Sequence, residues 1–569
     1  MPSELDIRLD AIMDQLTGPG GPLPLTTFEQ DGVTYPMIAT APPSLPPYFQ
    51  LFSMQHADKE FLVCGDERLT FAQVYAQARA VAGALVDGFG VKRGDHIGIA
   101  ARNAPAWIVL YMGIVMAGGV ASLLNGWWTG AELAAGIDDS DTKLVFADPQ
   151  RAARLSEVRH GAEIVALDIG QTIADALTPV LARGGGAETA LPELTGDDLA
   201  TILFTSGSTG QSKGAISTHR QVTQGIFSYL AQTLMSLQLI TEMEGGPPTL
   251  QPATLLNVPL FHVTAEIPVM LQSFAMGRKL VVMGKWDAEE AMRLMEKEKV
   301  TYFVGVPLMS YEIMTHPNRS KYDLSTVRDF AAGGAPRPVE HVKRLNDEMG
   351  GAKPLIGYGL TETNAVGCGN FRDNYLAKPN STGKASRPLV DLAILDDDGK
   401  PVPQGERGEI CIRSVCNFLK YYKNPEATKA AFTADRYFRT GDLGYLDEDG
   451  YVFIVDRKKD IIIRGGENIS CQEVEAALYE NLDVAEAAVF GIADARFGEV
   501  PAAVVHPAEG KSLTAEGLQT FLAARIAAFK IPERIWIATD PLPRLGTEKI
   551  DKVSIRNHFR ALVQRGTQA

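Results

Sequence analysis

The chain has 569 residues, of which 45% are hydrophobic and 22% charged, the composition of an ordinary globular protein that can bury a sizeable core. A chain of this length exceeds the size at which one core stops growing, so two or more domains are expected. The net charge of −15 disfavours nucleic acid as a partner, because most of the surface would repel a phosphate backbone.

The cysteines and the first residues point to a cytoplasmic protein. The five cysteines are odd in number and lack metal-ligand spacing, which predicts reduced thiols. The N-terminus carries early acidic side chains and no apolar run, so we expect no secretory signal. The oligomeric state lies beyond the sequence, and a homodimer is the candidate assembly.

The first predicted elements alternate between helices and strands. Thr70 can cap a helix with Gln73 at the capping-box position, and residues 96–100 form a short apolar strand. The uncharged residues 104–124 are long enough for a membrane span. Pro105 and later glycines interrupt them, however, which favours a buried helix followed by a buried strand. This alternation predicts α/β layering, with no transmembrane segment.

A strand at residues 200–204 leads into a loop with the features of a polyphosphate site. Its glycines allow backbone paths closed to other residues, its hydroxyl and N–H groups can face a phosphate, and its lysine adds positive charge. The spacing differs from the Walker motif, so a P-loop NTPase is the weaker assignment, and an ordinary turn is the alternative. The loop comprises Thr205, Ser206, Gly207, Ser208, Thr209, Gly210, Gln211, Ser212, Lys213 and Gly214.

Four later segments carry other residue types that a nucleotide-dependent ligase needs. Residues 357–362 (Gly-Tyr-Gly-Leu-Thr-Glu) combine an aromatic face for a purine, a hydroxyl for a phosphate and a carboxylate for Mg²⁺. Residues 332–336 form a small-residue turn that a flat base can approach. Residues 437–442 end in a carboxylate on a turn that can accept from ribose hydroxyls. Residues 542–550 offer a loop lysine that can stabilise charge on a reacting carboxylate. Each of these four motifs, taken alone, also has an ordinary structural explanation.

The last hundred or so residues form a separate unit in this pattern. A charged run at residues 456–460 separates two apolar strands, and a capping box at Ser470 begins a helix. The elements that follow predict a small α+β domain, although a solvated turn also explains the charged run. We place the boundary at Lys459, which divides the chain into residues 1–458 and 459–569.

The order of these five segments resembles the adenylate-forming superfamily of acyl-CoA synthetases, luciferases and peptide-synthetase adenylation domains. The resemblance covers residues 49–559 and implies a large N-terminal domain of layered α/β subdomains with a small mobile α+β C-terminal domain. It also implies that a carboxylic acid attacks the α-phosphate of ATP in the presence of Mg²⁺. Coenzyme A, as cosubstrate, then displaces AMP to form a thioester.

The resemblance further implies roles for individual residues. Lys549, Thr361, Glu362 and His262 correspond to the catalytic positions, with Glu362 as the metal ligand, and Lys459 corresponds to the hinge. The implied ATP-binding residues are Thr205, Ser206, Gly207, Ser208, Thr209, Gly210, Lys213, Gly334, Ala335, Pro336, Gly357, Tyr358, Gly359, Thr361, Asp442, Arg457 and Lys549. The implied CoA-binding residues are Gly465 and Gly466, and the implied acyl pocket comprises Phe261, His262, Val306 and Gly333.

Two positions depart from the superfamily pattern. Ser212 stands where a proline commonly precedes the loop lysine, which changes loop stiffness. Glu548 replaces the glycine that usually precedes the catalytic lysine, and its carboxylate can form a competing ion pair with Lys549.

The acid is the least constrained part of the prediction. Residues 226–243 are rich in Leu, Met, Ile and aromatic side chains, which suit an alkyl channel, although core packing is the favoured interpretation. No basic residue in 261–266 can pair with a second carboxylate, which disfavours dicarboxylic acids. We expect an apolar acid, chiefly a medium- or long-chain fatty acid, with aryl or branched acids as the alternative. An acyl-AMP ligase serving a carrier protein, a luciferase-like oxygenase and a nucleotide-binding switch or silent module stay open.

Overall fold

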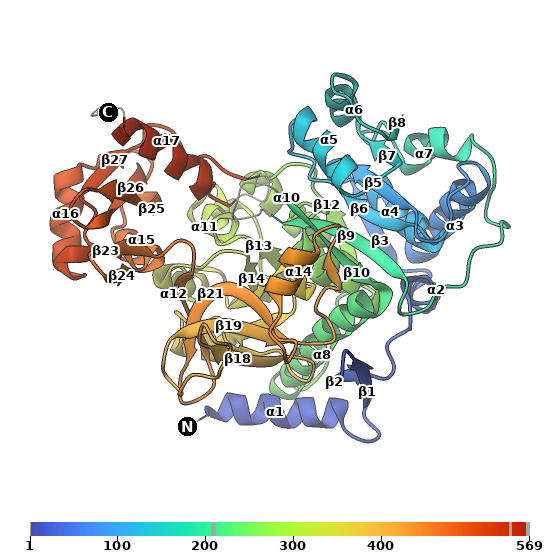
Figure 1. Ribbon diagram of the computed structural model, residues 1–569. Helices are drawn as coiled ribbons and strands as arrows, with labels where there is room; N and C mark the ends of the chain where they lie inside the picture. Colours follow the sequence, from blue (N-terminus) through green and yellow to red (C-terminus); the bar gives the residue numbers. More distant parts are fainter. Residues whose placement is uncertain (1, 206–211, 546–548, 565–569) are drawn as a thin grey trace.

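The computed structural model describes residues 2–205, 212–545 and 549–564. Figure 1 shows a large body formed by the N-terminal part of the chain and a smaller C-terminal lobe in orange to red. The chain enters the smaller lobe after β22 (Val452–Arg457). This architecture confirms the predicted α/β class with a large N-terminal and a small C-terminal domain; the boundary at residue 459 stays a prediction.

The larger sheet of the body has nine strands and carries most of the predicted site. In spatial order they are β17 (Lys384–Ala385), β16 (Gly367–Phe371), β15 (Lys353–Gly359), β14 (Asp329–Gly333), β13 (Tyr302–Gly305), β11 (Ala253–Leu256), β12 (Lys279–Val282), β3 (Glu60–Cys64) and β4 (Glu67–Thr70). The strands from β15 to β3 run parallel to one another. Because parallel strands end at the same edge, the segments that follow them meet there.

A second sheet of seven strands positions the phosphate-loop segment. Its order is β20 (Lys420–Tyr421), β10 (Lys213–Thr218), β9 (Leu199–Thr205), β6 (Val120–Leu123), β5 (His96–Ala100), β7 (Leu144–Ala147) and β8 (Glu163–Ala166). β9 and β10 pair antiparallel, with Thr205 opposite Lys213. The two ends of the predicted loop are therefore adjacent, while residues 206–211 lie outside the described part of the chain.

Buried helices fill the space around the two sheets. Thr70 caps α3 (Phe71–Asp87) in the predicted capping box with Gln73. The uncharged stretch forms α4 (Pro105–Met116), which is buried on all sides, followed by β6, as predicted. In the described part of the chain, no helix combines the length and apolar character that a membrane crossing requires. The other helices of the body are α2 (Leu45–Gln55), α5 (Gly130–Asp139), α6 (Pro149–Ser156), α7 (Ile173–Leu181), α8 (His219–Glu244), α9 (Gln272–Met276), α10 (Ala288–Glu298), α11 (Pro307–Thr315), α12 (Val339–Glu348), α13 (Arg372–Ala377) and α14 (Pro425–Ala431).

A buried carboxylate of the N-terminal helix joins it to several parts of the body. The helix α1 (Glu4–Thr17), which precedes the hairpin of β1 (Leu25–Gln30) and β2 (Val33–Ile38), lies along α8 (Figure 1). Asp6 of α1 accepts hydrogen bonds from Asn374 at 3.0 Å and Tyr451 at 2.9 Å, and it pairs with Lys384 at 3.2 Å. The first turn of α1 is thus held by three distant parts of the body.

A third, four-stranded sheet carries Asp442. Its strands are β18 (Asp391–Leu395), β19 (Gly408–Arg413), β21 (Phe438–Leu446) and β22, all antiparallel. Asp442 lies within β21, opposite Arg457, and not on the turn that the sequence predicts. The turn prediction was wrong because the Thr-Gly pair before Asp442, although typical of turns, continues the strand here with Gly441 at φ +74°.

The C-terminal lobe is the predicted α+β unit. A sheet of β24 (Glu467–Ile469), β23 (Ile462–Arg464), β26 (Gly498–Pro507), β25 (Val484–Asp494) and β27 (Arg534–Ile537) packs with α15 (Cys471–Tyr479), α16 (Ala515–Ala523) and α17 (Lys552–Gln564). Ser470 caps α15 by accepting from the Glu473 N–H at 3.0 Å. The reciprocal half of the predicted capping box is not formed, because the Glu473 carboxylate accepts from Lys530 instead.

Candidate active site

Four predicted segments meet where the parallel strands of the large sheet end. The chain after β11 carries Phe261 and His262, and Val306 follows β13 directly. β14 ends at Gly333, which lies opposite Gly357 of β15. The turn 334–336 and the start of residues 357–362 therefore leave the sheet side by side. This common edge brings the predicted acyl-pocket segments next to the predicted adenine-binding segments.

Tyr358, Asp442 and Arg457 form a connected polar group beside this edge. The Tyr358 hydroxyl donates to Asp442 Oδ2 at 2.7 Å, and Arg457 Nε pairs with Asp442 Oδ1 at 3.2 Å. Burial and the Asp442 carboxylate raise the pKa of Tyr358 well above its usual value, so its hydroxyl remains a donor. An aromatic ring beside a buried carboxylate is suited to a base and its attached ribose.

Lys549 reaches from the C-terminal lobe to the glycine turn of the body. A Cβ atom placed on Gly334 would lie 2.6 Å from Lys549 Cε and 2.8 Å from its Nζ, so the end of the lysine side chain lies directly against this glycine. Burial and the Arg457 cation lower the pKa of Lys549 to about 8, while Asp442 acts in the opposite direction. Lys549, the predicted adenylation lysine, therefore lies beside residues of the body that the sequence predicts to bind ATP.

His262 lies within the electrostatic reach of Lys549 and is a neutral side chain. Burial, with a smaller contribution from the Lys549 cation, lowers the pKa of His262 to about 3. Its Nδ1 accepts a hydrogen bond from the Thr264 N–H at 3.2 Å, which fixes the ring and leaves a proton for Nε2. The imidazole can pack against an acyl group or donate a hydrogen bond to it.

Glu362 is a buried carboxylate held by a residue that the sequence analysis missed. It lies in the 3₁₀ turn Thr361–Thr363, and its Oε1 accepts from the Tyr421 hydroxyl at 2.7 Å. Burial raises the pKa of Glu362, opposed by Tyr421 and by the Arg457 and Lys213 cations. Nothing in the sequence around Tyr421 signals this contact, because it depends on β20 joining the edge of the second sheet.

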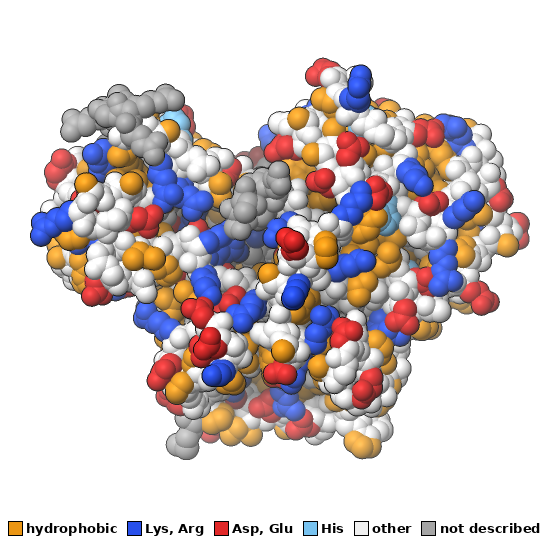
Figure 2. Space-filling model, in the orientation of Figure 1, with side chains coloured by type: hydrophobic (Ala, Val, Ile, Leu, Met, Phe, Trp, Pro, Cys, Tyr) orange, Lys and Arg blue, Asp and Glu red, His pale blue; other side chains and the backbone are white. Residues whose placement is uncertain are grey.

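Positive charge gathers at the site despite the net charge of −15. Lys and Arg side chains border the hollow between the two lobes in Figure 2. Within the site, burial raises the pKa of Glu362, and the Arg457 and Lys213 cations oppose this rise. Burial and the Lys549 cation lower the pKa of His262, and burial and Arg457 lower the pKa of Lys549. This is the local concentration of charge that an anionic nucleotide needs in an acidic protein.

The remaining predicted residues fall into two groups. Gly465 and Gly466 form the turn between β23 and β24, both with positive φ; a Cβ on Gly466 would meet nothing within 4 Å. The Gly465 N–H donates to the Phe497 carbonyl oxygen at 2.8 Å, within the C-terminal lobe, and Lys459 lies in the turn after β22. Ser206, Gly207, Ser208, Thr209, Gly210 and Glu548 lie outside the described residues.

The comparisons with known proteins agree with this geometry. Residues 49–422 match the AMP-binding enzyme family, and residues 473–549 match the C-terminal domain of AMP-binding enzymes. The chain is 33% identical to a feruloyl-CoA synthase of Amycolatopsis over 87% of this chain and 95% of that protein. It is 31% identical to the long-chain-fatty-acid–CoA ligase FadD13 of Mycobacterium tuberculosis over 88% and 95%.

Among solved structures, the ATP-bound MatB from Rhodopseudomonas palustris matches with a TM-score of 0.80 at 29% identity, covering 91% of this chain and 99% of that one. A fatty acyl CoA synthetase of Mycobacterium tuberculosis matches with a TM-score of 0.69 at 29% identity, covering 91% and 98%. The chain therefore belongs to the AMP-binding enzyme family, the adenylate-forming superfamily of acyl-CoA ligases, as its motifs predict.

Proposed function

We propose that the protein is an AMP-forming acid–thiol ligase that activates an apolar carboxylic acid as acyl-AMP and transfers the acyl group to coenzyme A. The observation that carries the proposal is the position of Lys549, which lies against Gly334 in the midst of Arg457, Asp442 and His262. A mobile cation at the junction of a nucleotide site and an acyl site is what the first half-reaction needs.

In the first half-reaction, a carboxylate oxygen of the acid attacks the α-phosphorus of ATP, and pyrophosphate leaves. Tyr358 holds the adenine, and Asp442 accepts from the ribose hydroxyls. Lys549 and Thr361 stabilise the charge that builds between the carboxylate and the phosphorus, while Lys213 and the loop 205–210 hold the outer phosphates. Catalysis then rests on positioning and electrostatic stabilisation, with no proton transfer and no covalent bond to the enzyme.

Glu362 fits a magnesium ion that arrives with ATP. Among the described residues, no cluster of three or more His, Cys, Asp or Glu side chains is arranged to hold a metal alone. Mg²⁺ is commonly bound by one or two carboxylates together with substrate phosphates and water, so one buried carboxylate next to Lys213 suits it. When bound, the ion neutralises phosphate charge.

In the second half-reaction, the thiol of coenzyme A attacks the acyl carbon and AMP leaves. Rotation of residues 459–569 about Lys459 would withdraw Lys549 and bring Gly465 and Gly466 to the site. The open surroundings of Gly466 support this role, since a Cβ atom placed there would meet nothing within 4 Å. His262 then borders the thiol path as a neutral group.

For the acid, we propose a medium- or long-chain fatty acid, bound at Phe261, His262, Val306 and Gly333. The similarity to a long-chain-fatty-acid–CoA ligase supports this class, while the similarity to a feruloyl-CoA synthase favours an aryl acid as the alternative. The relatives also include an oxalate–CoA ligase of Arabidopsis thaliana, at 30% identity. The apolar stripe of α8 gives limited support, because Phe227, Leu230 and Met235 are buried in the main hydrophobic core.

A panel of carboxylic acids, assayed for AMP and pyrophosphate with and without coenzyme A, tests the proposal. Fatty acids of increasing length, cinnamic and benzoic acids and oxalate cover the classes above. A ligase releases AMP only with an acid present and forms a thioester only when coenzyme A is added. Release of ADP and phosphate without acid would instead show a nucleotide switch, and no release at all a silent module.

A further inference from the structure

Tyr421 connects two groups of the site that belong to different strands. It lies in β20, opposite Ala215 of β10, and is 8% exposed. Its hydroxyl donates to Glu362 Oε1 at 2.7 Å. The ammonium of Lys213, at the start of β10, lies 5.0 Å from the centroid of the Tyr421 ring. One side chain therefore contacts both the buried carboxylate and the phosphate-loop lysine.

The ring is held firmly in this position. The Tyr421 N–H donates to Thr428 Oγ1 at 3.0 Å, and the ring packs edge-on against Phe418 at 4.8 Å between centroids. The Phe418 N–H in turn donates to the Glu362 carbonyl oxygen at 2.7 Å. These contacts fix the distance between the Tyr421 hydroxyl and the Glu362 carboxylate before any ligand binds.

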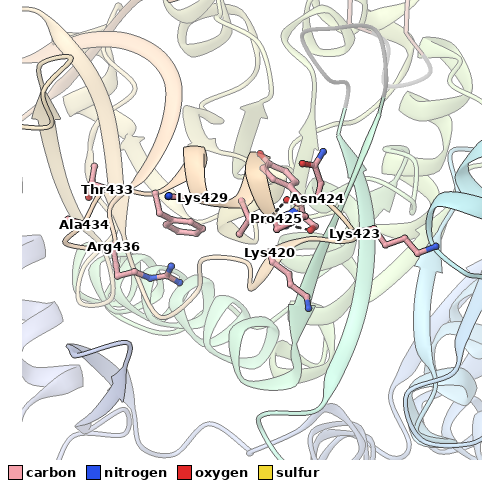
Figure 3. A pocket seen from close by; sticks show the side chains of 11 residues that line it. Lys420, Lys423, Asn424, Pro425, Lys429, Thr433, Ala434 and Arg436 are labelled. Carbon is pink, nitrogen blue, oxygen red and sulfur yellow. Dashed lines mark hydrogen bonds between the residues drawn. The ribbon is translucent and has the colours of Figure 1, made fainter.

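Tyr421 also lines an open pocket of about 680 Å³, whose other lining residues are seen in Figure 3. Lys420, Lys429 and Arg436 are among the residues that form this pocket with it. Glu362, in contrast, is buried. Tyr421 therefore belongs both to the lining of this pocket and to the contacts of the buried Glu362 carboxylate.

We propose that Tyr421 is a positioning residue for the metal–nucleotide complex: its hydroxyl orients the Glu362 carboxylate toward the divalent cation, and its ring holds the Lys213 ammonium for the phosphates. The proposal rests on the proposed function, since both partners act on ATP and its metal. It predicts that the two parts of the side chain have separable effects. The hydroxyl affects the metal, whereas the ring affects the nucleotide.

Two variants separate these effects, and a neighbouring tyrosine supplies the control. Tyr421→Phe removes one oxygen atom and keeps the ring under Lys213, while Tyr421→Leu removes both. Tyr422→Phe is the matched control, because the Tyr422 hydroxyl also donates to a carboxylate, Asp141 at 3.0 Å, away from Glu362. Thermal melting of each purified full-length protein checks that the variants are folded.

The readouts are the affinity for ATP without metal, measured by calorimetry, and the affinity of the ATP complex for Mn²⁺, measured by electron paramagnetic resonance. Tyr421→Phe is expected to weaken Mn²⁺ binding about tenfold, the usual effect of losing a hydrogen bond to a charged group, with metal-free ATP affinity within about twofold of wild type. Tyr421→Leu is expected to weaken both, and Tyr422→Phe neither.

Wild-type Mn²⁺ affinity in Tyr421→Phe would overturn the proposal, as would an equal loss of both affinities in that variant. These outcomes leave the proposed function intact if the wild-type enzyme still forms AMP from an acid. If the wild-type protein bound no Mn²⁺–ATP, both proposals would fall together.

Discussion

Lys549 of the C-terminal lobe crosses to Gly334 of the body, where any Cβ atom would come within 2.6 Å of its side chain. Gly334 also has φ +77°, a backbone conformation that favours glycine. In this conformation the lysine therefore lies at the proposed nucleotide site. The first half-reaction should depend on this contact, and the second should not.

Substitution Lys549→Ala should impair the first half-reaction and leave the second largely unchanged. We expect acid-dependent ATP–pyrophosphate exchange to fall by about 10²- to 10³-fold, the usual effect of removing one electrostatic stabiliser of a transition state. Thioester formation from preformed acyl-AMP should largely survive. Equal loss of both half-reactions in Lys549→Ala would refute this division of labour.

The pH dependence of adenylation should report the ionisation of Lys549. Burial and Arg457 lower its pKa to about 8, so the side chain is a cation below that pH and becomes neutral above it. In the free enzyme, kcat/KM for pyrophosphate exchange should therefore fall about tenfold per pH unit above pH 8. Bound ATP adds negative charge and should shift the corresponding limb of kcat to higher pH. A profile of kcat/KM that stays flat from pH 7 to 9.5 contradicts this assignment.

The Asp442 carboxylate should contribute mainly to nucleotide affinity. It accepts from Tyr358 and pairs with Arg457 in a buried position, so Asp442→Asn keeps the shape but removes the charge. We expect ATP affinity, measured by equilibrium dialysis, to fall by about 10- to 100-fold, as for the loss of a charged hydrogen-bond acceptor. Glu448→Gln, at an exposed position just after the same strand, is the control and should bind ATP like wild type.

The N-terminal helix offers a test of stability away from the active site. Asp6→Ala leaves the buried Asn374 and Tyr451 donors and the Lys384 cation without their acceptor, and should destabilise the protein by about 3 kcal/mol. Asp10→Ala removes a pair with Arg387 in which both side chains are about half exposed, and should change stability by less than about 1 kcal/mol. Urea unfolding followed by fluorescence compares the two; similar midpoints would contradict the anchoring role of Asp6.

The sequence predicts this fold and site unevenly, for physical reasons. The Thr70 cap, the strand at residues 96–100 and the buried helix α4 are local patterns of polarity, and the structure confirms them. The sequence predicts a turn at Asp442 because glycine-containing segments favour turns, yet pairing with β22 extends the strand through it. Tyr421 was missed because its contact with Glu362, 59 residues away, arises only from the packing of two sheets.

The central claim is that the acid attacks the α-phosphorus of ATP, and oxygen transfer tests it most directly. A carboxylic acid that the enzyme accepts, labelled with ¹⁸O in both carboxylate oxygens, is converted to its thioester and the nucleotide is analysed by mass spectrometry. The account predicts one ¹⁸O atom in the phosphate of AMP and none in pyrophosphate. Label recovered in inorganic phosphate, with ADP as the nucleotide product, would contradict it.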